Sequence, residues 1–268
     1  KGLQKSFAIA NSGFNISSIQ FAIHYMFGSN ESLNEFLKNL SECTKLGGYL
    51  IGTCFNGKKI FDLLSNTKIN ENFRFLNRNK ETMLEITKQY DRDEFTDDIS
   101  SLGYAIDVYQ SSINKTFTEY LVNFDYLTSV LENYGFVPLS LEELKKINLT
   151  QSIGSFEYLY NNMQNAIKKG KLDKNSIGES YKMTREEKDI SFLNNYFIYK
   201  KVRNVNIEDI KNVVTANTDE EELEKLKESL QTKNDSVSIE PIPIESLQPD
   251  KEEEIATIKI KTKTKTKK

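Results

Sequence analysis

The residues best suited to chemistry in this chain gather at two predicted strand ends. Residues 20–25, with the sequence QFAIHY, follow an apolar strand over 14–19 and combine an amide, an imidazole and two aromatic rings. Residues 52–56 lie at the end of a second apolar strand, which is predicted over 49–54. In open α/β sheets, ligands bind beyond the carboxyl ends of the strands. We therefore expect both segments to lie at a ligand-binding edge.

The histidine, the two cysteines and Glu119 indicate which kinds of site the chain can form. His24 is the only histidine, which excludes a His-rich metal site within the chain. Cys43 and Cys54 lack the spacing of a metal site or a disulfide framework, so they are expected to be reduced thiols of an intracellular protein. Glu119 lies in a strand-like segment, and burial without a partner would be costly for its carboxylate. A ligand or an internal partner is therefore expected for Glu119.

The elements that position residues 20–25 form a predicted strand–helix–strand unit. Apolar residues recur at helical spacing over 31–46, where Ser29 or Asn30 can cap the helix and Gly47-Gly48 is expected to end it. A strand, a crossover helix and a second strand make a parallel pair covered by helices. The fold class is therefore predicted to be α/β.

The rest of the chain gives further predicted elements. Strands are expected over 104–110, 119–124, 136–139 and 196–202, and helices over 125–134, 141–147 and part of 153–169. Ser140 with Glu143 forms a capping-box pattern. The segment 68–98 is polar and is expected to be a peripheral excursion, and 170–187 is expected to be a charged loop.

Composition predicts a folded body over 1–203 followed by a charged, largely disordered tail or linker over 204–268. The 38% apolar content, with 16 Phe and 13 Tyr, is sufficient for a core. The net charge of -3 conceals an acidic cluster at 252–254 and a Lys/Thr run over 259–268. No apolar run approaches the ~20 residues that cross a bilayer, and the start lacks a signal peptide core. No membrane association is expected.

Three motifs in this order resemble the mRNA cap (guanine-N7) methyltransferase family. They are residues 20–25, residues 47–53 (GGYLIGT) and residues 119–122 (EYLV). The resemblance covers about residues 14–202 and corresponds to the C-terminal portion of that domain. Residues 109–113 (YQSSI) and 192–197 (FLNNYF) look most like the capping enzymes of large DNA viruses. The implied fold is a class I S-adenosylmethionine-dependent, Rossmann-like sheet that is N-terminally incomplete.

The resemblance implies a role for each matching residue. Gln20 and Tyr25 would face the methyl donor, while Phe21 and His24 would face the cap guanine. Glu119 would accept hydrogen bonds from the guanine Watson–Crick edge. An aromatic residue near the last strand also contacts the cap in this family, and Tyr196 is the nearest match, although Asn194 is an alternative. No catalytic base is implied, because guanine N7 carries a lone pair and no proton, so alignment and electrostatics supply the acceleration.

The implied cofactor is S-adenosyl-L-methionine, and the implied substrate is capped RNA. In this fold, a Gly-rich turn after the first strand binds the methyl donor, and no such turn precedes Gln20 here. The chain is therefore expected to be a fragment that by itself binds the donor weakly or not at all. Upstream triphosphatase or guanylyltransferase domains, or a stimulatory subunit, are implied as partners. The expected location is host cytoplasm or virion if viral, and the nucleus if cellular. A non-catalytic methyltransferase-like interaction module and a small-molecule methyltransferase remain as alternatives.

Overall fold

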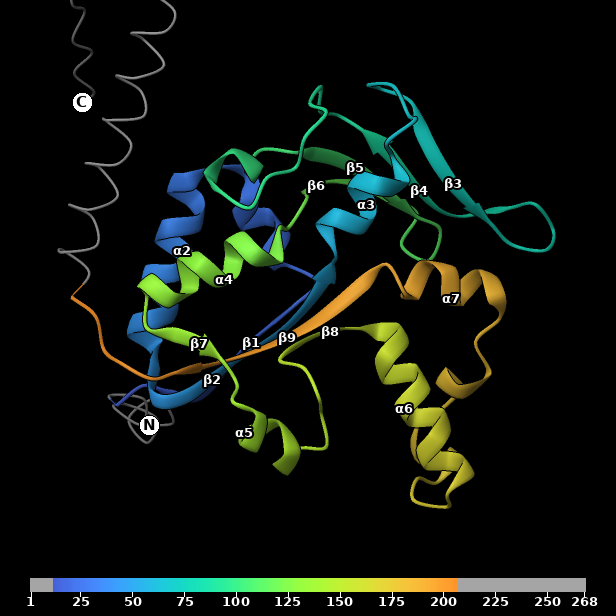
Figure 1. The fold of residues 1–268 in the computed structure, drawn as a ribbon. Coiled ribbons are helices and arrows are strands. Elements are labelled where there is room, and N and C mark those ends of the chain that lie inside the picture. Colours follow the sequence, from blue (N-terminus) through green and yellow to red (C-terminus); the bar gives the residue numbers. More distant parts are fainter. Residues whose placement is uncertain (1–11, 207–268) are drawn as a thin grey trace, which may run out of the picture. The chain divides into compact units, whose positions relative to one another are not determined.

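The structure of residues 12–206 is described by a computed structural model, in which two β-sheets stand apart and helices flank them (Figure 1). Sheet A has the order β1-β2-β9-β7, and β8 also pairs with β9. Its strands are β1 (Phe14–Gln20), β2 (Thr44–Phe55), β7 (Phe136–Pro138), β8 (Ile153–Ser155) and β9 (Asn194–Lys201). Sheet B is antiparallel throughout, with the order β3 (Asn72–Leu76), β4 (Thr82–Lys88), β5 (Ala105–Gln110) and β6 (Lys115–Tyr120).

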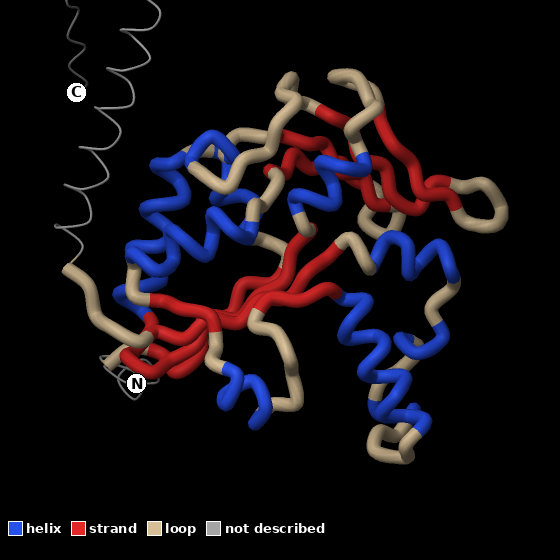
Figure 2. The backbone as a smooth tube through the Cα atoms, viewed as in Figure 1, coloured by secondary structure: helices blue, strands red, loops and turns tan. Residues whose placement is uncertain are grey.

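The longest helices are α2 with 14 residues and α6 with 13 among the described residues, and Figure 2 distinguishes helices from strands by colour along the backbone. The α-helices are α2 (Asn30–Cys43), α3 (Gly57–Leu63), α4 (Phe124–Asn133), α5 (Leu141–Lys146), α6 (Phe156–Lys168) and α7 (Arg185–Ser191). The 3₁₀ helices are η1 (Ile23–Gly28), η2 (Ile99–Ser101), η3 (Lys174–Ser176) and η4 (Ser180–Lys182). Over residues 12–206, no helix has the length and apolar character needed to span a membrane.

The predicted strand–helix–strand unit is confirmed, because β1 and β2 are parallel and α2 connects them. Ser29 caps α2 by accepting a hydrogen bond from the backbone N–H of Ser32. One face of α2 buries Leu33 and Leu37 in a core that also contains residues of β2, β9 and α4. The α/β prediction is therefore confirmed, although β9 runs antiparallel to β2 and makes sheet A mixed.

The predicted end of the first helix is wrong. Helix α2 ends at Cys43, and Gly47-Gly48 lies inside β2. The Nζ atom of buried Lys201 donates to the carbonyl oxygens of Ser41 and Thr44, at 2.5 and 2.9 Å, and satisfies the end of the helix. Pairing with β1 then draws the following residues into a strand with an irregular register. Gly47, with a φ of 77°, occupies the left-handed region that this irregularity requires.

The expectation that residues 68–98 form a polar excursion is also wrong. They supply β3 and β4, and Leu84, Ile86 and Tyr90 are buried in a second core with residues of β5 and α3. Glu85 and Thr87 of β4 alternate onto the opposite face of sheet B, since successive strand residues point to opposite sides. Composition averaged over the segment concealed this alternation.

Other predicted elements are found with shifted bounds. The strand expected over 119–124 is β6, which ends at Tyr120, and buried Asn123 caps α4 instead. The capping box of Ser140 and Glu143 is confirmed. The expected loop 170–187 contains η3, η4 and the start of α7. Strand β9 begins at Asn194, two residues before the predicted start. Residues 207–268, which make up most of the predicted tail, lie outside the described residues.

Candidate functional site

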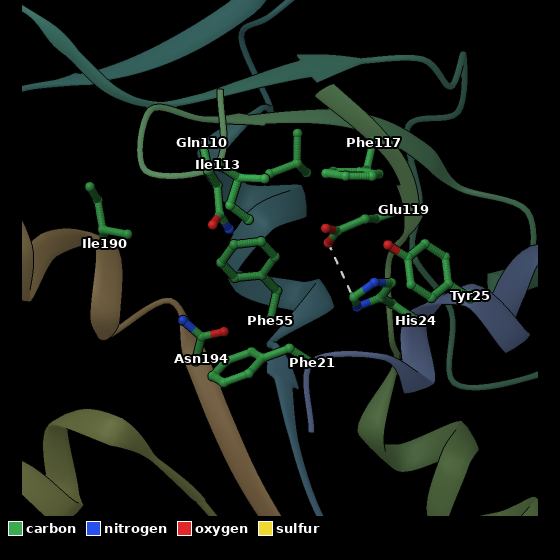
Figure 3. A pocket seen from close by; sticks show the side chains of 11 residues that line it. Phe21, His24, Tyr25, Phe55, Gln110, Ile113, Phe117, Glu119, Ile190 and Asn194 are labelled. Carbon is green, nitrogen blue, oxygen red and sulfur yellow. Dashed lines mark ion pairs between the residues drawn. The ribbon is translucent and has the colours of Figure 1, made fainter. Parts of the chain in front are cut away.

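A pocket of about 470 Å³ lies where the carboxyl ends of β1 and β2 face sheet B. Figure 3 shows the side chains converging on it from both sheets. The lining residues are Phe21, His24, Tyr25, Phe55, Val108, Gln110, Ile113, Phe117, Glu119, Ile190 and Asn194. Its volume is within the range of small-molecule sites, and its walls combine rings with a few polar groups. The predicted ligand site at the strand ends is therefore a pocket in the structure.

The turn after β1 aims three predicted residues into this pocket. Phe21 has a φ of 51°, which is rare for a residue with a bulky side chain, and its N–H donates to Thr53 O at 2.8 Å. Phe21 is 53% exposed, and its ring makes an edge contact with that of Phe156, with centroids 6.2 Å apart. The turn leads directly into η1, which carries His24 and Tyr25. Strained backbone of this kind concentrates at functional sites.

His24 and Glu119 form a buried polar pair at the end of the pocket. His24 Nδ1 lies 3.6 Å from Glu119 Oε2, and the residues are only 5% and 9% exposed. Burial lowers the pKa of His24 to about 4, because the imidazolium loses its hydration. Burial also raises the pKa of Glu119 to about 7. At neutral pH, His24 is therefore an uncharged imidazole, and Glu119 is near the midpoint of its titration.

The pair leaves hydrogen-bonding capacity unused. His24 Nε2 is buried and has no hydrogen-bond partner among the described residues. A buried polar atom without a partner costs free energy, unless a ligand or water satisfies it. The ring of Tyr25 lies edge-on to that of His24, with centroids 4.3 Å apart, and Tyr25 as a residue is 44% exposed. Burial and then the charge of Glu119 raise the pKa of Tyr25, so its phenol stays protonated and can donate a hydrogen bond.

Two predicted site residues lie outside the pocket lining. Gln20 is exposed at the end of β1, where its Oε1 accepts from Thr53 Oγ1 at 2.8 Å and its Nε2 donates to Ser18 Oγ at 3.0 Å. Tyr196 is buried, and its hydroxyl donates to Gln151 O at 3.0 Å. Asn194, the alternative to Tyr196, lines the pocket. The side-chain alternation along β9 turns Asn195 to the other face.

For a guanine nucleotide, the ligand that the sequence resemblance implies, we expect Asn194→Ala to weaken binding about threefold to tenfold, because it removes a polar group from the pocket wall. Tyr196→Phe should leave that affinity unchanged and lower the free energy of unfolding by about 1 kcal/mol, since it removes only the hydrogen bond to Gln151. Titration calorimetry with GTP and urea unfolding measure the two effects. The reverse pattern would assign the contact to Tyr196.

Sequence reasoning missed six lining residues, which include Phe117, Gln110 and Val108. Phe117 precedes Glu119 by two positions on β6, so strand alternation from Glu119 could have found it. Gln110 and Val108 depend on the pairing of β5 with β6, which brings them to the same face. Among residues 12–206, no group of three or more His, Cys, Asp or Glu side chains is placed to hold a metal ion.

Comparison with known sequences identifies the domain. The family model described as mRNA (guanine-N(7))-methyltransferase domain matches residues 1–202. A probable mRNA-capping enzyme of Acanthamoeba polyphaga mimivirus is 28% identical over 238 residues, which cover 80% of this chain and 19% of that protein. An mRNA cap guanine-N(7) methyltransferase of Schizosaccharomyces pombe is 43% identical over 47 residues, covering 18% of this chain and 13% of that protein. The chain spans about a fifth or less of these relatives.

Solved structures add distant similarities. An S-adenosylmethionine-dependent methyltransferase from Clostridium acetobutylicum has 15% identity and a TM-score of 0.31, covering 48% of this chain and 50% of that one. The CcbJ methyltransferase from Streptomyces caelestis has 7% identity and a TM-score of 0.37, covering 74% and 61%. Both TM-scores are below 0.5, and the family assignment comes from the sequence match over residues 1–202. Because that model matches well over half of the residues, the chain belongs to the mRNA (guanine-N(7))-methyltransferase domain family.

Proposed function

We propose that the complete protein transfers a methyl group from S-adenosyl-L-methionine to N7 of the cap guanine of RNA, and that this chain supplies the guanine pocket. The observation that carries the proposal is the buried pair of His24 and Glu119 beside the exposed ring of Phe21. The family assignment is independent support. An interaction module would have no ligand-based reason to keep these groups together in a pocket.

The pocket suits a guanine base. An ionised Glu119 can accept from N1–H and from the exocyclic amine, which are adjacent donors on one edge of the base. The ring of Phe21 offers a face for stacking, which contributes about 1–3 kcal/mol for a nucleobase. After transfer, the cationic methylated base would gain cation–π attraction to the same ring. Neutral His24 has ring nitrogens that can donate or accept toward the base.

Gln20 and Tyr25, the two residues that the resemblance implies for the methyl donor, have exposed polar groups that suit this role. The amide of Gln20 and the phenol of Tyr25 are exposed at the carboxyl end of β1, and both can hydrogen-bond to the amino-acid end of S-adenosylmethionine. The bound donor supplies an activated methyl group on its sulfonium. Guanine N7 needs no deprotonation, so the chain's own residues have three tasks. They orient the base, exclude water and keep the Glu119 carboxylate next to the base. Capping domains or a stimulatory subunit in the same assembly are part of this proposal.

The proposal is tested by the base of the cap. The complete protein should methylate RNA that carries a GpppA cap and should methylate an IpppA cap, which lacks the exocyclic amine, about tenfold to a hundredfold less efficiently. The physical reason is that one hydrogen bond to the Glu119 carboxylate, worth about 1.5–3 kcal/mol, is lost. Transfer of tritiated methyl to RNA measures this. Equal rates on both caps would contradict recognition through Glu119, and no transfer to either would overturn the proposed activity.

A further inference from the structure

Strand β6 presents three side chains on the pocket side of sheet B: Lys115, Phe117 and Glu119. Phe117 and Glu119 line the pocket. Lys115 pairs with Gln110 across the ladder, and Gln110 also lines the pocket. Cross-strand partners share one face of an antiparallel sheet, and so do alternate residues of a strand. A cation, a ring and a carboxylate therefore follow one another along one face.

The first two members of this row lack partners. The ammonium group of Lys115 has no ion pair or hydrogen bond within residues 12–206, whereas Lys58 and Lys200 are both paired with carboxylates. Phe117 is 42% exposed although it faces the pocket, and it makes no ring contact with another described aromatic residue. The positive charge and the apolar ring are thus both available to a ligand.

On the face of sheet B that carries Lys115, the neighbouring strands β4 and β5 place no acidic side chain. The acidic residues of the neighbouring strands are Glu85 on β4 and Asp107 on β5, and both alternate onto the other side of sheet B. There Glu85 is paired with Arg74, and Asp107 accepts from Thr118. Glu119 stands four residues away, at the far end of the row. An anionic ligand group would therefore meet a free cation at the outer end of the pocket.

The spacing of the row matches a nucleotide. Alternate residues in a strand are about 7 Å apart, so Lys115 and Glu119 are separated by about 13 Å along β6. A guanine nucleotide presents its Watson–Crick edge, then its ring and ribose, and then its phosphates, in the same order as carboxylate, ring and cation. A lysine ammonium binds phosphate as a compact point charge.

We propose that Phe117 forms the second wall of the guanine pocket and that Lys115 binds the triphosphate bridge of the cap. This inference rests on the proposed function, because it takes Glu119 as the contact of the guanine edge. Phe21 and Phe117 would then flank the base from opposite sheets, as their positions around the pocket in Figure 3 suggest. The capped 5′ end would be distinguished from a free nucleoside by its phosphates.

The test compares guanosine with the dinucleotide GpppA as ligands of the 268-residue chain. Lys115→Gln should weaken GpppA binding about fivefold and leave guanosine binding unchanged. Phe117→Ala should weaken both ligands about tenfold, in line with the loss of base stacking. Lys80→Gln, in the turn between β3 and β4, is the matched control and should change neither affinity. Raising the salt concentration should weaken GpppA binding to the native chain more than to Lys115→Gln.

The outcomes separate this inference from the proposed function. GpppA binding that is lost in Glu119→Gln but unchanged in Lys115→Gln and Phe117→Ala would overturn the present inference alone. Failure of the native chain to bind either ligand would overturn the guanine pocket and this inference with it. Because Phe117 and Lys115 are exposed, thermal unfolding of both variants should match the native chain, which excludes loss of folding as the cause.

Discussion

Replacing Glu119 by Gln in the complete protein is expected to lower kcat/KM for methylation of capped RNA about 10²- to 10³-fold. Glutamine has one acceptor oxygen and sets an N–H₂ donor against a donor of the guanine edge. One charge-assisted hydrogen bond, worth about 1.5–3 kcal/mol, is lost and the other is weakened; together they cost about 3–4 kcal/mol, and each 1.36 kcal/mol is tenfold in rate. Glu143→Gln is the control, since Glu143 is paired with Lys200 away from the pocket. Unchanged kcat/KM in Glu119→Gln would remove Glu119 from the site.

The same residue makes guanine binding depend on pH. Only the ionised carboxylate accepts from both guanine donors, and burial raises the pKa of Glu119 to about 7. The ionised fraction, and with it the affinity, should rise about tenfold between pH 6 and pH 8. His24 stays neutral over this range, because burial lowers its pKa to about 4. Titration calorimetry with GpppA should show this rise in the native chain and a flat profile in Glu119→Gln.

The free energy of unfolding should fall as the pH rises, whereas the affinity for guanine rises. The pKa of Glu119 rises from 4.5 to about 7 on folding, so its contribution is fully favourable below pH 4.5 and is lost as pH rises through about 7. Ionised Glu119 then costs about 3 kcal/mol of unfolding free energy. Glu119→Gln should therefore stabilise the chain at pH 8 and have little effect at pH 5. Urea unfolding at the two pH values measures the difference, and equal effects at both would contradict the buried carboxyl.

The second large effect is expected for Gly52→Ala, which should lower the free energy of unfolding by about 3 kcal/mol. Gly52 lies in β2 between Ile19 of β1 and Phe197 of β9. A Cβ there would come within 3.0 Å of the carbonyl oxygen of Ile19 and of the fully buried ring of Phe197. Neither neighbour can move freely, and overpacking of this kind costs about 1–3 kcal/mol.

The change at Gly52 should also reach the pocket. Ile19 directly precedes the turn that holds Phe21, whose N–H donates to Thr53 O on the same strand as Gly52. Displacing the end of β1 should therefore weaken GpppA binding as well. Urea unfolding gives the stability change, and Thr53→Ser is the control, expected to stay within 0.5 kcal/mol of the native chain. A Gly52→Ala chain as stable as the native one would show that β1 and β9 can separate without cost.

Sequence alone determined the parts of the fold that depend on short-range patterns. Apolar spacing and the Ser29 cap predicted the helix between β1 and β2, and the capping box at Ser140 predicted the start of α5. Sequence reasoning found β5 and β6 but missed β3 and β4 of sheet B, because these two strands alternate apolar and polar residues within a segment that is polar on average. The end of α2 depended on Lys201, a residue far along the chain that satisfies its carbonyls.

For the candidate site too, the sequence determined some features and the tertiary structure determined others. The motif at residues 20–25 and the position of Glu119 were evident in the sequence, because each is a local pattern that resembles a family. Only the tertiary structure placed Glu119 against His24, and burial of that pair is what shifts both pKa values. It also showed that Asn194 lines the pocket and Tyr196 does not: Asn194 begins β9 opposite Phe55, which lines the pocket, whereas Tyr196 lies two residues farther along the same face, opposite Thr53. The pairing of β9 with β2, a strand about 140 residues earlier in the chain, sets how far along the strand each side chain lies from the pocket, and no local pattern in residues 194–196 contains that information.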